Sequence, residues 1–481
     1  MDSLSRILVV CIAACVTSLT SDGALKPSIL EVRLMTHVAS DSPTGSAFRC
    51  IVIRSLESNG QILIPRGSIV MGSVRRAKAV GLGIVRERAT MDLSFAECRT
   101  PDGQTFPLHA RLASIDNSRE RVTRSGQIRG VIAANDPNRF IFGLWMRPSL
   151  NLFSRALIGL TGASNQIWSK LEMGPIGAAA LFALRYKMFP LAEPEIHLPP
   201  GTDMKLAVSL PHPDSRHAAV PTAPRIAPEL GVWIRQQPFE IEREDGRPAP
   251  DIINVAFLGS EQDLQDAFLT AGWYRADPAT IRNYSRMFGA FNSMREYSSA
   301  PVSTLLYSDI PPAIVYEKSL NSVAKRHHVR IWQAGVIDGE PVWLGAATHD
   351  IGIGFNFRNA SFTHKIDNRI DLERAKIVTD LVFAGCSQAP AQVERPDAAA
   401  LSGHDTNALV TDGAVAVLGL QSCTAPAYLD DSPAPLPSRN KLKRFTRRFF
   451  LETRNYVVRE NLYYWGYRLI ERKWTKQAFS D

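Results

Sequence analysis

Short apolar runs separated by glycine and proline turns follow one another from residue 27 onward, and this pattern is typical of β-strands. The runs include residues 29–34, 48–53, 61–64 and 69–74. The turn sequence Pro101-Asp102-Gly103 lies between two further runs, residues 91–97 and 106–112, and predicts a hairpin. We therefore expect an all-β barrel or sandwich over residues 27–210.

A helical insertion is expected inside this β domain, at about residues 140–190. The segments FIFGLW, ALIGLTG and GPIGAAALFAL are apolar enough to contact a membrane or to form a packed helix pair. Four basic residues interrupt the apolar face and favour the packed pair: Arg155, Lys170, Arg185 and Lys187. Just before the insertion, the polar sequence SIDNSRE (114–120) is interpreted as a turn with side-chain caps.

A proline-rich linker at 211–230 precedes a second domain, expected at 231–422, whose pattern mixes helices and strands. A strand is predicted at 251–258, a helix from the cap Ser260 through Leu269, and a further helix at 279–291. A second linker, residues 423–438, leads to a basic tail at 439–481. The predicted fold class is therefore α+β multidomain, with antiparallel strands in the second domain.

The second domain contains a predicted hairpin that carries most of its histidines. The strands are RHHVRIW (326–332) and VWLGAATHD (342–350), with Asp338 and Gly339 as the two loop residues. In this register His327 faces Asp350 and His328 faces His349. A change of one residue would move every side chain to the other face of the sheet.

Two family resemblances follow from these residues. GQILIPRGSIVMGS, FAECRTPDGQTFPL and PEIHLPPGTDMKLAVSL, between 60 and 210, resemble the C-terminal β-barrel of the type IV secretion and conjugation channel scaffold. RHHVRIW, VWLGAATHDIG and THKIDNRIDLERAKIVTDL resemble the LssY C-terminal domain family over about 251–422. The first resemblance implies a structural or docking domain. The second implies an association with membranes and secretion, without an established activity.

The hairpin and the segment after it suggest a candidate site. Imidazole and carboxylate groups are suitable ligands for a divalent metal, and the metal candidates are His327, Asp350, His364 and Asp367, with Asp371 nearby. His328 and Arg330 extend the set of catalytic candidates, because Arg330 could hold a phosphoryl or carboxylate group. Three interpretations stay open: a structural hydrogen-bond network, ligand binding, and metal-dependent hydrolysis.

The first 24 residues are interpreted as an export signal. A short apolar run, residues 7–19, follows Arg6, as in a signal peptide. Ile12-Ala13-Ala14-Cys15 also resembles a lipobox, so a lipoprotein, an uncleaved anchor and a buried helix stay open. Cys50, Cys98, Cys386 and Cys423 remain after the leader, and buried free thiols are favoured slightly over disulfides.

The net charge of +8 lies in the tail. Residues 439–481 hold twelve Lys or Arg and four Asp or Glu, so the rest of the chain is balanced and gives no support for a nucleic-acid-binding domain. The tail has the pattern of a basic amphipathic helix, which either lies on an anionic membrane or packs on the protein. Its membrane-contact candidates are Lys441, Arg444, Arg447, Arg448, Trp465 and Trp474.

These features favour an exported bacterial envelope protein of structural or interaction type, located in the periplasm or on an envelope membrane. Its expected partners are envelope or secretion proteins. The alternative is a hydrolase that uses the cluster of His327, Asp350 and His364 with a divalent metal.

Overall fold

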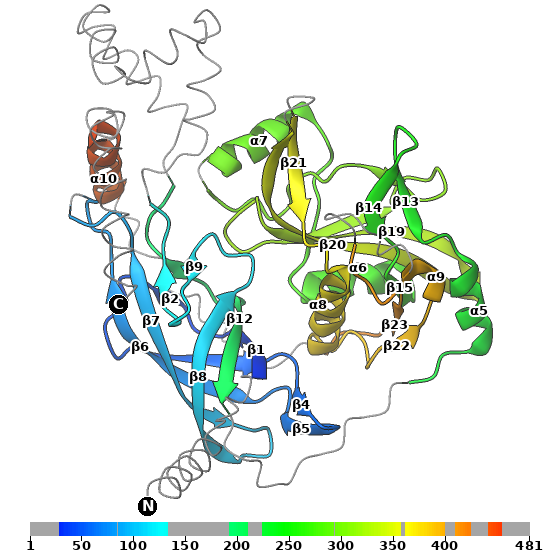
Figure 1. The fold of residues 1–481 in the computed structure, drawn as a ribbon, viewed down its shortest axis with the longest axis horizontal. Coiled ribbons are helices and arrows are strands. Elements are labelled where there is room, and N and C mark those ends of the chain that lie inside the picture. Colours follow the sequence, from blue (N-terminus) through cyan, green and yellow to red (C-terminus); the bar gives the residue numbers. More distant parts are fainter. Residues whose placement is uncertain are drawn as a thin grey trace, which may run out of the picture.

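The computed structural model describes residues 28–83, 85–132, 192–209, 224–292, 294–356, 361–399, 409–424 and 441–454. The predicted leader, the insertion at 140–190 and most of the two linkers lie outside these residues. Figure 1 shows a β-barrel beside a larger domain of mixed helices and strands. Both parts of the predicted fold class are confirmed.

The first domain is a six-stranded antiparallel barrel. Its sheet runs in the order β6-β3-β1-β12-β8-β7, and pairing of β6 with β7 closes the ring. The strands are β1 Ser28–Leu34, β3 Ala47–Val52, β6 Ile69–Lys78, β7 Thr90–Arg99, β8 Thr105–Ile115 and β12 Asp203–Ser209. Short strands decorate it: β2 Val38–Ala39, β4 Leu56–Ser58, β5 Gln61–Ile64, β9 Arg121–Val122, β10 Ile128–Arg129 and β11 His197–Leu198.

Alternating apolar residues fill the barrel. Leu30, Val32 and Leu34 of β1 are fully buried and share one face because successive strand residues point to opposite sides. The predicted Pro101-Asp102-Gly103 hairpin is present between β7 and β8, and Gly103 has a φ of +87°. A left-handed backbone at this turn favours glycine, which has no Cβ to clash.

The second domain is built on an eight-stranded sheet in the order β16-β18-β19-β20-β15-β23-β22, with β21 paired to β20. β15 and β23 are parallel, and the other neighbours are antiparallel. The strands are β15 Val255–Leu258, β16 Tyr274–Arg275, β18 Ile314–Lys318, β19 Arg326–Ile337, β20 Glu340–Asn356, β21 Ser361–Ile366, β22 Ala391–Val393 and β23 Val415–Gly419. A separate three-stranded sheet holds β13 Glu240–Arg243, β14 Pro248–Ile252 and β17 Leu305–Leu306.

Helices cover both faces of the large sheet. Apolar side chains of α6 (Glu261–Thr270) and α8 (Ile370–Phe383) pack on one face, and those of α5 (Pro228–Gln236) pack on the other. α7 (Ile281–Asn292) and α9 (Pro396–Ala399) complete the domain. The predicted cap is confirmed, because Ser260 and Asp263 form a reciprocal capping box at the start of α6.

Two boundaries differ from the sequence prediction. The linker was expected to extend to residue 230, but α5 already begins at Pro228, where proline suits the first turn because its missing N–H is not needed there. The strand predicted at 251–258 is two strands, β14 and β15, which belong to different sheets. Among the described residues, no helix is long and apolar enough to cross a membrane.

The four cysteines after the leader divide into two pairs. Cys386 and Cys423 form a disulfide, so the preference for free thiols was wrong for this pair. Cys50 and Cys98 are buried free thiols in the barrel, as predicted. Burial raises the pKa of the Cys98 thiol to about 11, which keeps it protonated and unreactive near neutral pH.

Candidate functional site at the domain interface

The hairpin of β19 and β20 has the predicted turn and a different register. Asp338 and Gly339 form the loop with φ values of +53° and +83°, and Ile337 pairs with Glu340. A bulge between Gln333 and Gly335 then shifts the pairing by one residue. The predicted pairs are therefore wrong: His327 faces His349, and Asp350 faces Arg326.

This shift divides the predicted cluster between the two faces of the sheet. Paired residues share a face and neighbours along a strand alternate, so His327 and His349 lie on one side and Arg326, His328 and Asp350 on the other. A set containing both His327 and Asp350 therefore cannot surround one ion. In the metal site predicted from His327, Asp350, His364 and Asp367, the pair of His327 and Asp350 is therefore wrong, and the His364 side chain lies outside the described residues.

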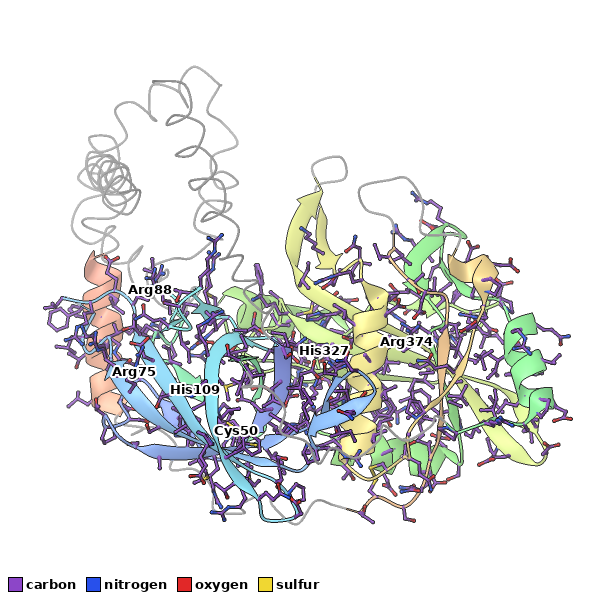
Figure 2. The ribbon with its side chains drawn as sticks, turned by 60° about the horizontal axis from the view of Figure 1, so that its bottom comes forward. Cys50, Arg75, Arg88, His109, His327 and Arg374 are labelled. Carbon is purple, nitrogen blue, oxygen red and sulfur yellow. A yellow bond between two sulfur atoms is a disulfide. The ribbon has the colours of Figure 1, made fainter. Side chains whose placement is uncertain are left out.

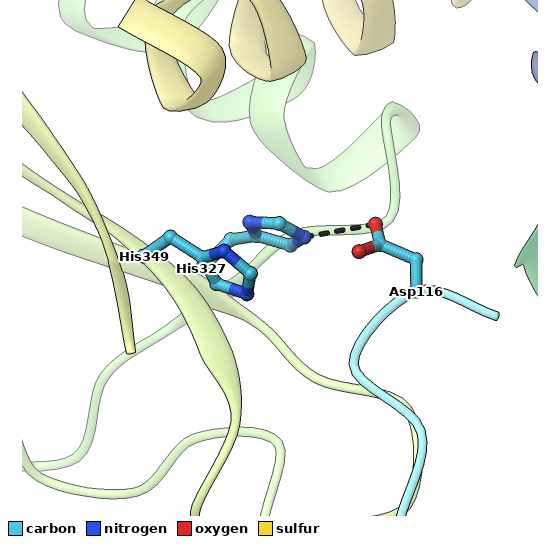
Figure 3. A group of neighbouring side chains, drawn as sticks. All are labelled: Asp116, His327 and His349. Atoms are coloured by element: carbon cyan, nitrogen blue, oxygen red, sulfur yellow. Dashed lines mark hydrogen bonds and ion pairs between the residues drawn. The ribbon is translucent and has the colours of Figure 1, made fainter. Parts of the chain in front are cut away.

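His327 points across the boundary between the domains, as Figure 3 shows. Its Nε2 lies 2.9 Å from Oδ2 of Asp116, at the end of barrel strand β8. Its Nδ1 lies 2.6 Å from Oε2 of Glu373 on α8. With an acceptor at each nitrogen, the imidazole is best satisfied when both nitrogens are protonated.

Electrostatics favour this charged form. Burial of the His327 ring opposes its charge, but the carboxylates of Glu373 and Asp116 outweigh burial and raise its pKa to about 10. His349 stacks on His327 with ring centroids 4.4 Å apart. Burial and the neighbouring His327 charge lower the pKa of His349 to about 3, so this ring is neutral.

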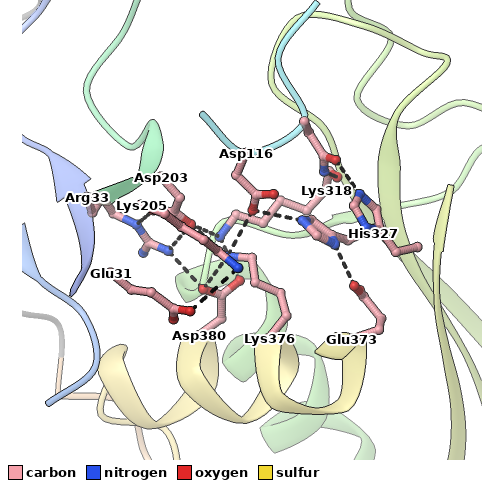
Figure 4. Close-up of polar contacts among 12 residues, drawn as sticks. Glu31, Arg33, Asp116, Asp203, Lys205, Lys318, His327, Glu373, Lys376 and Asp380 are labelled. Atoms are coloured by element: carbon pink, nitrogen blue, oxygen red, sulfur yellow. Dashed lines mark hydrogen bonds and ion pairs between the residues drawn. The ribbon is translucent and has the colours of Figure 1, made fainter. Parts of the chain in front are cut away.

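A second cluster of buried charges continues the interface, as Figure 4 shows. Asp380 of α8 accepts from Arg33 of β1 at 2.9 Å, from Lys318 of β18 at 2.8 Å and from Lys376 of α8 at 2.9 Å. Asp203 of β12 accepts from Arg33 at 2.7 Å and from Lys376 at 2.6 Å. Three cations and two carboxylates from both domains are therefore interlocked.

Burial disfavours the charged form of each group in this cluster, so the opposite charges nearby determine whether the groups are ionised. Lys318, Lys376 and Arg33 outweigh burial and hold the pKa of Asp380 well below its usual range. Burial and the nearby Arg33 lower the pKa of Lys318 to about 8. The side chain of Asp380 is fully buried, so removing any partner would leave an uncompensated charge inside the protein.

The barrel segment 114–120 supplies further contacts with the second domain. The Asn117 amide donates to the Lys318 carbonyl at 3.2 Å, and its Oδ1 lies 2.7 Å from Nε2 of His349. Asn321 receives the Arg119 N–H at 2.9 Å and donates to Glu120 at 2.7 Å. The segment was interpreted as a capped turn; it is also a docking loop.

Apolar contact accompanies these polar ones. Phe383, at the end of α8, packs against Met35, Ile51 and Ile53 of the barrel. The Arg33 guanidinium carbon also lies 5.1 Å from the centre of the Phe383 ring. The interface therefore combines a hydrophobic contact with the buried ion pairs.

A pocket of about 1060 Å³ lies on the opposite face of the large sheet. Arg326 donates to Glu317 at 2.9 Å and to Asp350 at 3.0 Å, while His328 lies 3.8 Å from Asp350. Of these residues, Arg326, His328 and Asp350 line the pocket, together with Arg330, which pairs with Asp251 at 2.5 Å. Burial raises the pKa of Glu317 to about 8, although Arg326 opposes this shift.

Arg330 is therefore held by an internal carboxylate and does not present a free guanidinium for a phosphoryl group. Asp367 pairs with Arg369 at 3.0 Å outside the pocket. Asp371, in the first turn of α8, accepts from the Thr411 hydroxyl and the Asp412 N–H at 2.8 Å each. Of His364, the structure describes only the backbone, which pairs with Ile353 in the sheet.

The tail begins as helix α10, Lys441–Arg454, which confirms a basic helix there. Arg447 was predicted to contact a membrane, but it is buried and pairs with Glu195 and Glu193 of the first domain. The ion pairs explain this correction, because they orient one helix face toward the barrel. The side chains of Lys441 and Arg444, and all of Trp465 and Trp474, lie outside the described residues.

Sequence reasoning did not find Asp116, Asp203, Glu373, Lys376 and Asp380 as members of one site. They come from three separate elements, and only the docking of the two domains brings them together. Glu373, Lys376 and Asp380 do have helical spacing, so a charged stripe on α8 was visible in the sequence. At the interface between the domains, the described residues offer paired charges and one imidazole-carboxylate cluster, centred on His327.

Comparison with known proteins gives a family for the second domain. No curated protein matches the chain. Among solved structures, ComB10 of the Com type IV secretion system of Helicobacter pylori matches at 12% identity and a TM-score of 0.18, covering 38% of this chain and 85% of that one. Residues 235–415 match the model of the LssY C-terminus family. The second domain is therefore similar to the LssY C-terminus family, as its motifs indicated.

Proposed function

We propose that the chain is an exported bacterial envelope protein that acts through contacts with other proteins, with its barrel and LssY domain docked as one unit. The observation that carries this proposal is the engagement of His327 between Asp116 and Glu373. The strongest candidate for catalysis is thereby used to join two domains. Its partners are envelope or secretion proteins.

The disulfide supports the location of the protein. Cys386 and Cys423 are bonded, and disulfides persist in oxidising compartments such as the periplasm. The apolar run at residues 7–19 supplies a matching export signal. Both features favour the periplasm or the periplasmic side of an envelope membrane.

Fractionation with thiol trapping tests the location. The full chain is expressed in a bacterium, and free thiols are blocked before lysis. We expect envelope or periplasmic recovery with Cys386 and Cys423 protected from the reagent, and a Cys386→Ser variant in which Cys423 becomes reactive. Recovery in the cytosol with both thiols reactive would contradict export.

Cross-linking in cells tests the interaction. We expect defined cross-linked partners for the native chain and their loss in Asp380→Asn, which weakens the docking of the domains. Asp245→Asn is the matched control, because it removes a carboxylate from an exposed ion pair with Arg247. Equal cross-linking in all three proteins would show that docking of the domains is not needed for interaction.

The tail is proposed as a second contact, with an anionic membrane surface. The exposed side chains Leu442, Phe445 and Phe449 of α10 support this proposal, since Arg447 holds the other side of the helix on the barrel. Liposome flotation of the full chain and of a chain ending at residue 438 tests it. Equal binding of the two chains to anionic liposomes would refute membrane contact by the tail.

A further inference from the structure

Asp116, His327 and His349 converge at the boundary between the domains (Figure 3). Each offers one ligand atom, and these atoms all lie within 4.8 Å of one another. We propose that these three side chains bind a divalent transition metal ion of the zinc class, which joins the barrel to the LssY domain. This site differs from the predicted one, because only His327 is common to both.

The donor set suits this ion. Two imidazoles and one carboxylate are ordinary zinc ligands, and donors bound to one tetrahedral ion lie about 3.4 Å apart. The His327 Nε2 and Asp116 Oδ2 atoms are 2.9 Å apart, already within that spacing. Ligand atoms at the 4.8 Å limit must therefore approach by up to about 1.4 Å, and the His327–Asp116 pair must separate by about 0.5 Å.

The surroundings of both rings resemble those of metal-bound histidines. Such rings are oriented through the nitrogen that does not bind the metal, by a carboxylate or another oxygen acceptor. The Nδ1 of His327 has Glu373 at 2.6 Å, and Glu373 is itself buried on α8. The Nε2 of His349 has Asn117 Oδ1 at 2.7 Å. Metal at Nε2 of His327 would displace the proton shared with Asp116.

The backbone of the docking loop fixes the barrel's contribution. Asn117 has a φ of +49°, a left-handed conformation that asparagine tolerates better than most residues. This turn directs both Asp116 and Asn117 toward the second domain. Lys376 lies 3.8 Å from the Asp116 carboxylate and opposes a cation there. Its charge is largely balanced by Asp203 at 2.6 Å and Asp380 at 2.9 Å.

Metal titration of the purified full chain tests the proposal. After chelation and dialysis, the native protein should bind one equivalent of Zn²⁺, and Co²⁺ should give the visible absorption of a tetrahedral site. Asp116→Asn and His349→Gln should lose this equivalent. His109→Gln should keep it, because His109 is exposed on the barrel away from the interface (Figure 2).

A ligand exchange keeps the test decisive if a variant folds poorly. His349→Cys should restore cobalt binding and add a thiolate charge-transfer band, because cysteine is also a zinc ligand. An absence of metal binding by the native chain, or an unchanged equivalent in both Asp116→Asn and His349→Gln, would overturn the proposal. Either result leaves the export and cross-linking tests of the proposed function untouched.

Discussion

Replacing Asp380 by asparagine should be among the most damaging isosteric changes in the described part of the chain. The Asp380 carboxylate accepts from Arg33, Lys318 and Lys376, and also from the Trp273 indole at 2.9 Å. After the change, three buried cations share the carboxylate of Asp203. Breaking a buried ion pair in this way costs about 3–5 kcal/mol.

The expected loss can be measured as a shift of the unfolding midpoint. In domains of this size 1 kcal/mol corresponds to about 2–4 °C, so Asp380→Asn should lower the midpoint by about 6–20 °C. Asp245→Asn is the control, since its pair with Arg247 is exposed and contributes about 1 kcal/mol or less. Circular dichroism melts of both variants suffice. A midpoint for Asp380→Asn within the range of the control would show that the buried ion pairs of Asp380 do not stabilise the fold.

Three further predictions concern separate parts of the molecule. The folded-state pKa of His327, about 10, lies above the unfolded value of about 6.5. The contribution of His327 to the free energy of unfolding should therefore be complete below pH 6.5 and be lost as the pH rises toward 10. Denaturant titrations at several pH values should show this decrease in the native chain and not in His327→Gln. Gly345→Ala should destabilise the sheet by about 1–3 kcal/mol, because the new methyl would lie 2.6 Å from Val255, whereas Gly419→Ala meets nothing and should be neutral by the same titration. Reduction of the Cys386–Cys423 disulfide, with a sequence separation of 37, should lower stability by about 4 kcal/mol, measured as the shift in urea midpoint with and without reductant.

The hairpin of β19 and β20 shows which features of the fold could be predicted from sequence patterns. Strand identity and the Asp338-Gly339 loop follow from local chemistry and were predicted. The register was not predicted, because it depends on a bulge at Gln333–Gly335 that the local sequence does not indicate. One such residue exchanges the two faces of the sheet, and the candidate site changes with it.

The interface between the two domains could not be predicted from sequence patterns, for a different reason. Asp116 and Asn117 were interpreted as turn residues, and both do lie in a turn. Their partners His327 and His349 lie more than 200 positions away along the chain. Local spacing carries no information on which domain surface meets which, so the docking of the barrel on α8 had to come from the structure.

The coupling free energy between Asp116 and His327 measures most directly whether these two residues join the domains. Unfolding free energies of the native chain, Asp116→Asn, His327→Gln and the double variant, all with a chelator present, give this coupling as a double-mutant cycle. If Asp116 and His327 join the two domains, the coupling should be about 1 kcal/mol or more, as for a buried charge-assisted contact. Effects of the two changes that add to within about 0.3–0.5 kcal/mol would contradict it.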